Sequence, residues 1–597
     1  MEFNQKKRSE LEKKYTWNLE GIFPNHDALD QALEKVTTEI QQISKWEGHI
    51  MDSADTLLRF FQETDQLIIE ARKIGVYISN RFNENNGDPT YQTYYAKLQA
   101  MFTELSSSLS FVNPELLQHE KSDFQRFIEE KPELQIFEKR LNDILKYKPH
   151  TLSAEEEKII STLSPLFDTG SRAFSMLTVA DMKFPDVEVE GKLVPLTHGN
   201  FVPLMEKAPR KDRKSIFETF YQAFDQHKNT LATTLDATVK SNAIQAKLKN
   251  FSSARHQALF QNAIPLDVYD SLIETVHHYL PELHDYMDVR KKVLGLEDLH
   301  LFDIYAPLVE DVDMTFSFEE ARDMILDAMK PLGNDYVNVL RHGFDNRWCD
   351  VFETEGKRTG AYSSGSYGTD PFILLNYHGT LDNVFTVAHE MGHSMHTYHS
   401  NKYQPYCYSR YSIFVAEVAS TLNESLLTYY LLDQWKDEKR RKYVLNHFLE
   451  TIRGTLFRQT QFAEFERDIY AQYEKGGALT ADFLSEQYHQ LNGQYYGPTM
   501  TNDDSIRFEW ARIPHFYYNF YVYQYATGIS CALSFAKRIL EGGEKERELY
   551  LGYLKSGSSL DPIDVLKRAG VDISTPQPVE DAIELFKKFK EEFKSYM

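Results

Sequence analysis

Cysteine is scarce in this chain. Only Cys349, Cys407 and Cys531 occur among 597 residues, and none has a partner at CxxC spacing. Cysteines so few and odd in number argue against a disulfide framework and are typical of a protein in a reducing compartment. The first residues are charged and no apolar stretch follows them, so the sequence offers no secretory signal. These features predict a cytoplasmic protein.

Long hydrophobic runs and excess positive charge are also lacking. No stretch approaches the roughly 18 uninterrupted apolar residues that a membrane-spanning helix needs. Lysine and arginine number 66 against 89 acidic residues, which gives a net charge of −23. A duplex-binding protein needs the opposite balance to displace counterions from phosphates. The basic run at 439–442 follows two acidic residues and is typical of a solvated helix face. We expect neither a membrane nor nucleic acid as a partner.

Most of the sequence has the apolar spacing of three and four residues that is typical of helices. Before residue 200, this pattern covers 27–47, 54–81, 89–111, 121–146 and 154–165. Helical periodicity resumes at about residue 209 and continues to the end. Two stretches differ: residues 184–194 alternate across a Glu-Gly step and predict a hairpin, and the glycine-containing 360–377 predicts two extended segments. We therefore expect a mainly α fold with a domain boundary near residue 200.

The segment that carries chemistry is His389-Glu390-Met391-Gly392-His393. On a helix, His389 and His393 are one turn apart and can reach a single ion. Glu390 lies about 100° further round, where it can accept a proton from water beside that ion. The alternative is a helix with two incidental histidines, but the apolar residues 384–388 indicate a buried helix, where such groups need partners.

Catalytic zinc usually takes a third protein ligand. One peptidase class has its third histidine ligand ten residues after the first, behind a glycine that breaks the helix, and His399 has that spacing. Here His396 occupies the glycine position. On an unbroken helix His399 lies about 240° round from His393 and cannot reach the same ion. His396 itself shares the zinc-facing side, but three ligands from one straight helix give poor tetrahedral geometry.

The better candidate for the third ligand is Glu417, because a carboxylate in so apolar a stretch is costly to bury unless it is paired or coordinates a metal. A core Glu in a salt bridge is the alternative. Glu424 is seven residues further along the same face and is a candidate to orient a ligand histidine, with an ordinary surface acid as the alternative.

A tyrosine-rich segment occupies 515–528 and contains five tyrosines in nine residues. Periodicity alone favours a core or groove lining. Peptide hydrolysis passes through an oxyanion, however, and phenol groups there would be useful donors.

Together these motifs resemble the thimet oligopeptidase family of zinc metallopeptidases. The resemblance rests on His389-Glu390-Met391-Gly392-His393, on Glu417 opening Glu417-Val418-Ala419-Ser420, and on His515 with Tyr518 and Tyr525. The last segment and the early Tyr15-Thr16-Trp17-Asn18-Leu19 are most similar to its oligoendopeptidase F branch. The similarity extends over nearly the whole chain.

The resemblance implies a mainly helical, two-lobed fold with a deep substrate channel and a small β-sheet beside the active-site helix. Residues 1–199 would form a helical lobe that caps the cleft, and 200–597 the catalytic domain. One Zn²⁺ per chain would be bound by His389, His393 and Glu417.

The same resemblance assigns further roles. Glu390 would be the catalytic base, and His515, Tyr518 and Tyr525 would contact the substrate or the oxyanion. The thimet branch has a glycine-containing loop between this histidine and the first tyrosine, and this chain is shorter there. The segment Gly360–Tyr367 would be the edge strand that pairs with the substrate backbone, through Gly360, Ala361, Tyr362 and Ser363.

These expectations predict a zinc-dependent endopeptidase that hydrolyses internal bonds of short peptides. Two alternatives are a related zinc exopeptidase that removes dipeptides from the C-terminus and a catalytically silent peptide-binding protein. The first needs a positive group for the terminal carboxylate, and the sequence singles none out. The intact Glu390 argues against the second.

Overall fold

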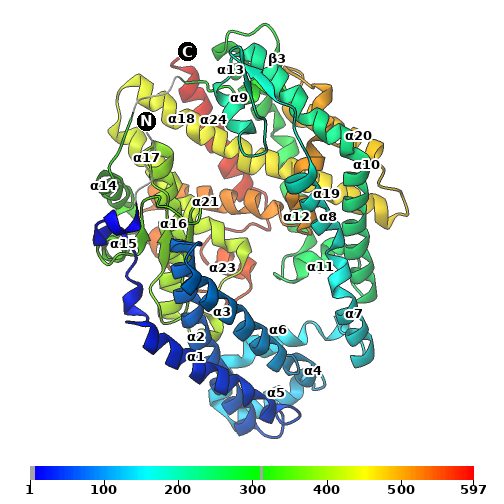
Figure 1. Cartoon of the computed structure of the whole chain (residues 1–597), viewed down its shortest axis with the longest axis vertical. Helices are drawn as coiled ribbons and strands as arrows, with labels where there is room; N and C mark the ends of the chain where they lie inside the picture. Colours follow the sequence, from blue (N-terminus) through cyan, green and yellow to red (C-terminus); the bar gives the residue numbers. More distant parts are fainter. Residues whose placement is uncertain (1–6, 310–313) are drawn as a thin grey trace. The chain divides into compact units, whose positions relative to one another are not determined.

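A computed structural model describes residues 7–309 and 314–597 of the chain (Figure 1). Helices dominate it, which confirms the expected mainly α fold. The chain divides into two compact units, each built from three separated stretches. The first unit comprises Met1–Thr151, Asp313–Tyr430 and Phe535–Gly570, and the second comprises Leu152–Val312, Leu431–Ser534 and Val571–Met597. The predicted division into residues 1–199 and 200–597 stays a prediction.

The first unit contains short and long helices and one three-stranded sheet. Its helices are α1 (His26–Gln41), α2 (Ala54–Glu84), α3 (Pro89–Ser108), α4 (Val112–Leu116), α5 (Lys121–Glu130), α6 (Glu138–Leu145), α14 (Phe318–Ala328), α15 (Asn334–Asp345), α16 (Leu381–Tyr403), most of α17 (Ile413–Gln434), α22 (Glu544–Leu554) and α23 (Pro562–Arg568). Its strands are β4 (Cys349–Asp350), β5 (Tyr362–Ser364) and β6 (Phe372–Leu374).

The second unit has two small two-stranded sheets among its helices. The helices are α7 (Ala154–Phe167), α8 (Thr169–Ser175), α9 (Phe201–Lys207), α10 (Arg210–Leu248), α11 (Ala254–Phe260), α12 (Leu266–His278), α13 (Leu280–Val293), α18 (Glu438–Ile452), α19 (Arg458–Glu474), α20 (Ala481–Tyr496), the first part of α21 (Tyr523–Gly542) and α24 (Gln577–Lys594). The strands are β1 (Val187–Val189) with β2 (Lys192–Val194) and β3 (Leu299–His300) with β7 (Met500–Thr501).

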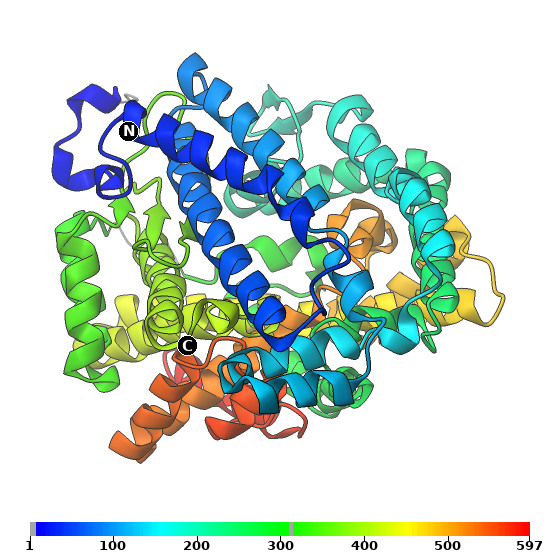
Figure 2. The same ribbon diagram turned by 90° about the horizontal axis from the view of Figure 1, so that it is seen from below.

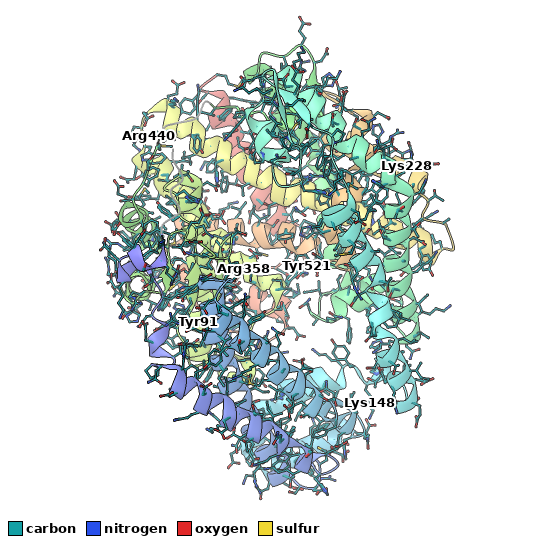
Figure 3. The ribbon with its side chains drawn as sticks, in the orientation of Figure 1. Tyr91, Lys148, Lys228, Arg358, Arg440 and Tyr521 are labelled. Atoms are coloured by element: carbon teal, nitrogen blue, oxygen red, sulfur yellow. The ribbon has the colours of Figure 1, made fainter. Side chains whose placement is uncertain are left out.

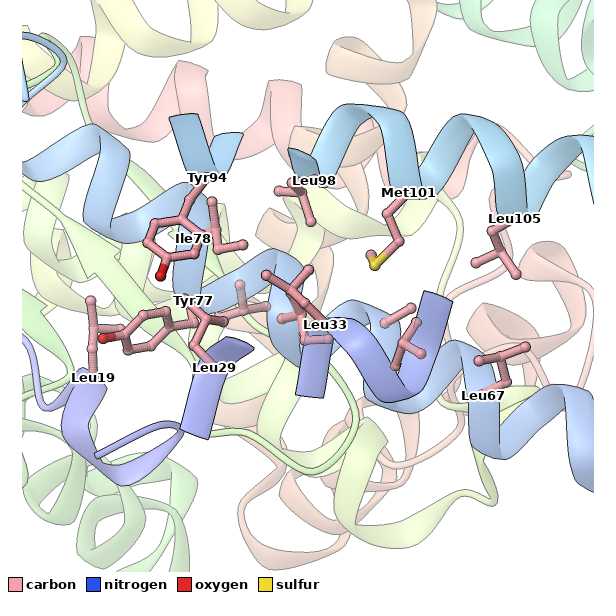
Figure 4. Close-up of a cluster of buried hydrophobic side chains, with 14 of the residues drawn as sticks. Leu19, Leu29, Leu33, Leu67, Tyr77, Ile78, Tyr94, Leu98, Met101 and Leu105 are labelled. Carbon is pink, nitrogen blue, oxygen red and sulfur yellow. The ribbon is translucent and has the colours of Figure 1, made fainter. Parts of the chain in front are cut away.

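Helices α1, α2 and α3 pack side by side in the first unit, as both ribbon views show (Figures 1 and 2). Leu29 and Leu33 of α1 follow the spacing of a buried helix face and belong to the same apolar cluster as Tyr77 of α2 and Leu98 of α3 (Figure 4). The indole N–H of Trp17 donates to the Ile373 carbonyl at 2.8 Å, which ties the N-terminal segment to strand β6.

Two sequence expectations have clear outcomes. The hairpin at 184–194 is confirmed as the antiparallel pair β1–β2, whose turn places Glu190 and Gly191 at positive φ. The helical periodicity at 121–146 corresponds to two helices with a break between them, because α5 ends at Glu130 and α6 begins at Glu138. Pro132 explains the break, since proline lacks the N–H of an interior helical residue and disfavours helical geometry in the residue before it.

The sheet of the first unit has the order β4-β6-β5, so β5 is an edge strand. It pairs antiparallel with β6, with Ser363 opposite Ile373. Extended structure was expected at 360–368 and 372–377, and the structure contains a shorter strand within each.

Among the described residues, no helix is long and apolar enough to cross a membrane.

Candidate metal centre and active site

Helix α16 carries the HExxH segment. Thr380 caps its N-terminus by accepting the backbone N–H of Asn383 at 3.2 Å. The helix then runs unbroken to Tyr403, so His389 and His393 lie one turn apart and their rings approach with centroids 4.8 Å apart. The local sequence therefore produces the two-histidine face that the spacing predicts.

Helix α17 crosses α16 at Gly392. A Cβ at this glycine would lie 2.5 Å from Ser420 Cα and 2.6 Å from the Ala419 carbonyl oxygen, both backbone atoms. The helices also bond through the Asn423 amide, which donates to the Ala388 carbonyl at 3.1 Å. The sequence motifs do not identify this role of Gly392. The available signal was a glycine inside an otherwise apolar, buried helix.

This close crossing brings Glu417 to the two histidines. Its Oε2 lies 3.5 Å from His389 Nε2 and 3.7 Å from His393 Nε2. In the described part of the chain, these three residues form the one group of His, Cys, Asp or Glu whose donor atoms all lie within 4.8 Å of one another. Ligands placed tetrahedrally at zinc bond lengths are about 3.3 Å apart. Two imidazoles and a carboxylate at these separations fit a zinc ion.

Glu424 of α17 holds one of these histidines in place. Its carboxylate bonds to Nδ1 of His389, which leaves Nε2 directed at Glu417. Burial opposes protonation of His389, but the pairing with Glu424 outweighs it and raises the pKa of His389 to about 9. Burial and the neighbouring His389 lower the pKa of His393 to about 3.

Glu390 lies next to the ligand group with its side chain largely buried. Its relative exposure is 7%, and its Oε2 has no hydrogen-bond partner within the described structure. Burial and the nearby Glu417 and Glu424 raise the pKa of Glu390 to about 7, against the opposing charge of His389 and the Ser363 backbone N–H. A buried carboxylate with one unpartnered oxygen is suited to receive a proton from a small polar molecule.

His396 and His399 do not join the ligand group. The His396 ring stacks on Tyr411 with centroids 3.6 Å apart, and burial lowers its pKa well below the usual value. His399 donates its Nδ1–H to the Met395 carbonyl at 2.7 Å. Both are neutral core residues of α16.

Edge strand β5 lies beside α16. Its Ser363 hydroxyl is 2.8 Å from the Ser394 hydroxyl of α16, one residue beyond His393. Exposed Gly360, with φ of +84°, and half-buried Ala361 lead into the strand. The Tyr362 hydroxyl is fixed by Asn80 and Asn83 of α2 at 3.0 and 2.8 Å. Of the residues expected to bind substrate, Tyr362 and Ser363 lie in this edge strand, with the Ser363 backbone N–H at Glu390, and Gly360 and Ala361 directly precede it.

The other predicted residues lie in the second unit, where they form an aromatic cluster. The His515 ring lies 5.5 Å from Tyr518 and 6.0 Å from Tyr525, between centroids. Tyr521 completes this cluster at 5.5 Å from Tyr525 and is labelled in Figure 3. Burial and the nearby Arg458 lower the pKa of His515.

The tyrosines of this segment have two different environments. Tyr517 is buried and its hydroxyl bonds to that of Thr234 at 2.8 Å, and Tyr523 is likewise buried, whereas Tyr518 is 53% exposed. The sequence motifs point to Tyr518 and Tyr525 but not to Tyr521, because periodicity does not distinguish Tyr521 from its buried neighbours.

A helical body with an HExxH helix and a glutamate from the next helix defines the chain as a metallopeptidase. Residues 203–585 match the model of "Peptidase family M3" and residues 115–184 that of "Oligopeptidase F". Oligopeptidase PepF of Bacillus subtilis is 44% identical over 99% of this chain and 88% of its own length. The chain belongs to peptidase family M3.

Solved structures give the same result. A crystal structure of oligoendopeptidase-F from Enterococcus faecium is 36% identical and covers 96% of this chain and 99% of its own, with a TM-score of 0.75. A structure from Chlamydophila abortus is 34% identical, covers 99% of this chain and 100% of its own, and has a TM-score of 0.92. The resemblance to oligoendopeptidase F is thereby confirmed, and the protein is an oligopeptidase that acts on peptides.

Proposed function

We propose that the chain is a zinc-dependent endopeptidase that cuts internal bonds of short peptides. The convergence of His389 Nε2, His393 Nε2 and the Glu417 carboxylate within 4.8 Å carries this proposal. Glu390 follows His389 directly on the same helix, so a carboxylate base comes with the ligand set.

His389, His393 and Glu417 would hold the ion, and their two imidazoles and one carboxylate are a donor set that zinc favours. When bound, Zn²⁺ would supply a Lewis acid that polarises the scissile carbonyl and makes water more acidic. Glu424 would keep His389 in the tautomer whose Nε2 is free to coordinate.

Glu390 would act as the general base. Its unpartnered, buried Oε2 supports this role, because it can accept the proton of the attacking water and then pass it to the leaving amine. Proton transfer by a positioned carboxylate contributes about 10²- to 10⁴-fold to a rate.

His515, Tyr518 and Tyr525 would contact the substrate or donate to the developing oxyanion. The clustering of these polar rings, with Tyr518 largely exposed, supports a role outside the core. Because Tyr521 joins the same cluster, we add it to the candidates.

Gly360, Ala361, Tyr362 and Ser363 would pair with the substrate backbone. The position of β5 at the sheet edge and its contact with α16 support this, since an extended peptide can add to an exposed edge. The substrate channel that would restrict the enzyme to short peptides stays a prediction, as does the cytoplasmic location.

The test is hydrolysis of an internally quenched peptide that is blocked at both ends. Wild type should cut it internally, and Glu390→Gln should lose about 10²- to 10⁴-fold in kcat while retaining one zinc per chain. Glu544→Gln, at a glutamate whose side chain is 82% exposed in the first unit, serves as the matched control. Failure of wild type to cut blocked peptides would contradict endopeptidase activity, and full activity of Glu390→Gln would contradict the role of this base.

A further inference from the structure

A small polar pocket lies between the end of α2 and the segment leading into β5. It has a volume of about 290 Å³, and its lining includes Asn80, Asn83, Arg358, Tyr362 and Ser364. At roughly 30 Å³ per water, this is room for about ten water molecules or one polar side chain. Every residue that lines the pocket belongs to the first unit, and no Asp or Glu lines it among the described residues. We call it the Arg358 pocket.

The backbone that carries Arg358 is held at several points. Its N–H donates to the Asn83 carbonyl at 3.0 Å. The Asn376 side chain donates to the carbonyls of Arg358 and Gly360, at 3.1 and 2.8 Å. The guanidinium therefore extends from a fixed segment, and less conformational entropy is lost when it binds a ligand.

The Arg358 side chain has an aromatic support and, among the residues that the structure describes, no acidic partner. Its guanidinium carbon lies 5.6 Å from the centre of the Tyr362 ring, and Asn80 and Asn83 hold the hydroxyl of that tyrosine. Within the part of the chain that the structure describes, no carboxylate comes within ion-pair distance of this guanidinium. Its neighbour Lys357, by contrast, is fully buried and pairs with Asp350 at 2.7 Å. A held, exposed guanidinium facing a pocket whose described lining contains no acids is suited to bind a carboxylate.

The pocket lies along the strand that borders Glu390. Ser363 contacts α16, and Arg358 precedes it by five residues, which is at most about 16 Å of extended chain. Tyr362 and Ser364 point to the face of β5 opposite that of Ser363. A peptide paired with β5 would thus present alternate side chains to the pocket within about five residues of the scissile bond.

We propose that the Arg358 pocket is a substrate subsite that binds a carboxylate of the peptide, and so favours substrates with an acidic group at a set distance from the cleaved bond. This inference rests on the proposed endopeptidase function. The carboxylate has two sources, an acidic side chain or the C-terminus, and both present the same planar acceptor to the guanidinium.

The experiment uses one quenched peptide sequence in which glutamine is replaced by glutamate at one position at a time, with a free or an amidated C-terminus. At low salt, kcat/KM should be about five- to fifty-fold higher in one of two comparisons. Either a peptide with glutamate at one position is cut faster than the same peptide with glutamine there, or the peptide with a free C-terminus is cut faster than the amidated one. The first result assigns a side-chain subsite and the second a terminal-carboxylate site. The preference should weaken at 0.5 M salt.

Variants test whether Arg358 carries the preference. Arg358→Gln should bring the Glu-to-Gln ratio close to one, and Arg358→Lys should retain part of it. The matched control is Arg59→Gln, since Arg59 is also exposed, lies over an aromatic ring in the same unit and is remote from the pocket. It should leave the ratio unchanged.

Binding of the same peptides to Glu390→Gln, measured by fluorescence anisotropy, gives the ratio of affinities for acidic and neutral peptides without turnover. If wild type does not cut the blocked peptides, the endopeptidase proposal fails, while the anisotropy ratio still tests the subsite. Equal affinity for acidic and neutral peptides, or a preference that survives Arg358→Gln, would overturn the subsite.

Discussion

Gly392→Ala tests whether the close crossing of α16 and α17 builds the ligand group. The added Cβ would lie 2.5 Å from Ser420 Cα and 2.6 Å from the Ala419 carbonyl oxygen. Carbon atoms in contact stand about 3.5 to 4.0 Å apart, so one helix must move by about 1 Å. Both atoms belong to the α17 backbone, and no side-chain rotation relieves the clash.

The consequence for metal binding follows from this displacement. Ligand distances tolerate about ±0.2 Å, and a shift of about 1 Å between Glu417 and the histidines is several times larger. We expect zinc affinity at least about tenfold lower, with a parallel loss of activity. Overpacking should also destabilise the first unit by about 1 to 3 kcal/mol and lower its Tm.

The matched control is Gly552→Ala in α22, where a Cβ would meet nothing within 4 Å. Alanine is better than glycine in an open helix by about 0.5 to 1 kcal/mol, so this variant should be as stable as wild type or slightly more stable. Competition with a zinc indicator and thermal melts of the metal-loaded proteins measure both effects. If Gly392→Ala retained wild-type zinc affinity and melted no lower, the reasoning about this crossing would be refuted.

Three further predictions concern second-unit stability and the ligand group. Burial raises the pKa of Glu466 to about 8, against the opposing Phe520 backbone N–H. A carboxyl group whose pKa is raised on folding destabilises the folded protein as pH rises from about 4.3 towards 8. Glu466→Gln removes this cost, so its free energy of unfolding should exceed that of wild type by a margin that grows by up to about 1.4 kcal/mol per pH unit in this window. Urea melts at pH 5 and 8 measure this gain. A difference in unfolding free energy between Glu466→Gln and wild type that does not change with pH would contradict it. Glu424→Gln should lower zinc affinity by about ten- to a hundredfold by weakening the orientation of His389, and unchanged affinity in the indicator assay would count against that role. Removal of zinc by a chelator should lower the Tm and abolish hydrolysis, with zinc restoring both, and full activity after verified removal would exclude a catalytic metal.

Local patterns of the sequence were enough to single out the three candidate ligands, although they lie on two helices. The four-residue spacing of His389 and His393 requires only helical geometry, and Glu417 stood out because it interrupts an apolar stretch. The hairpin at 184–194 was predictable for the same reason, since alternation and a Glu-Gly turn are adjacent in the chain.

Features that depend on packing between distant segments were not predictable. The requirement for glycine at 392 depends on where α17 crosses α16, which no periodicity specifies. The Arg358 pocket joins residues of α2 and β5 that are about 280 positions apart in sequence. Tyr521 and the buried Tyr517 occupy the same aromatic run, and only their tertiary neighbours distinguish them.

The most direct test of the central claim is an anomalous diffraction map recorded at the zinc absorption edge from crystals of active protein. The account predicts one peak about 2.0 to 2.2 Å from His389 Nε2, His393 Nε2 and a Glu417 carboxylate oxygen. A peak at other residues, or none between these three in crystals of protein that cleaves peptide, would contradict it.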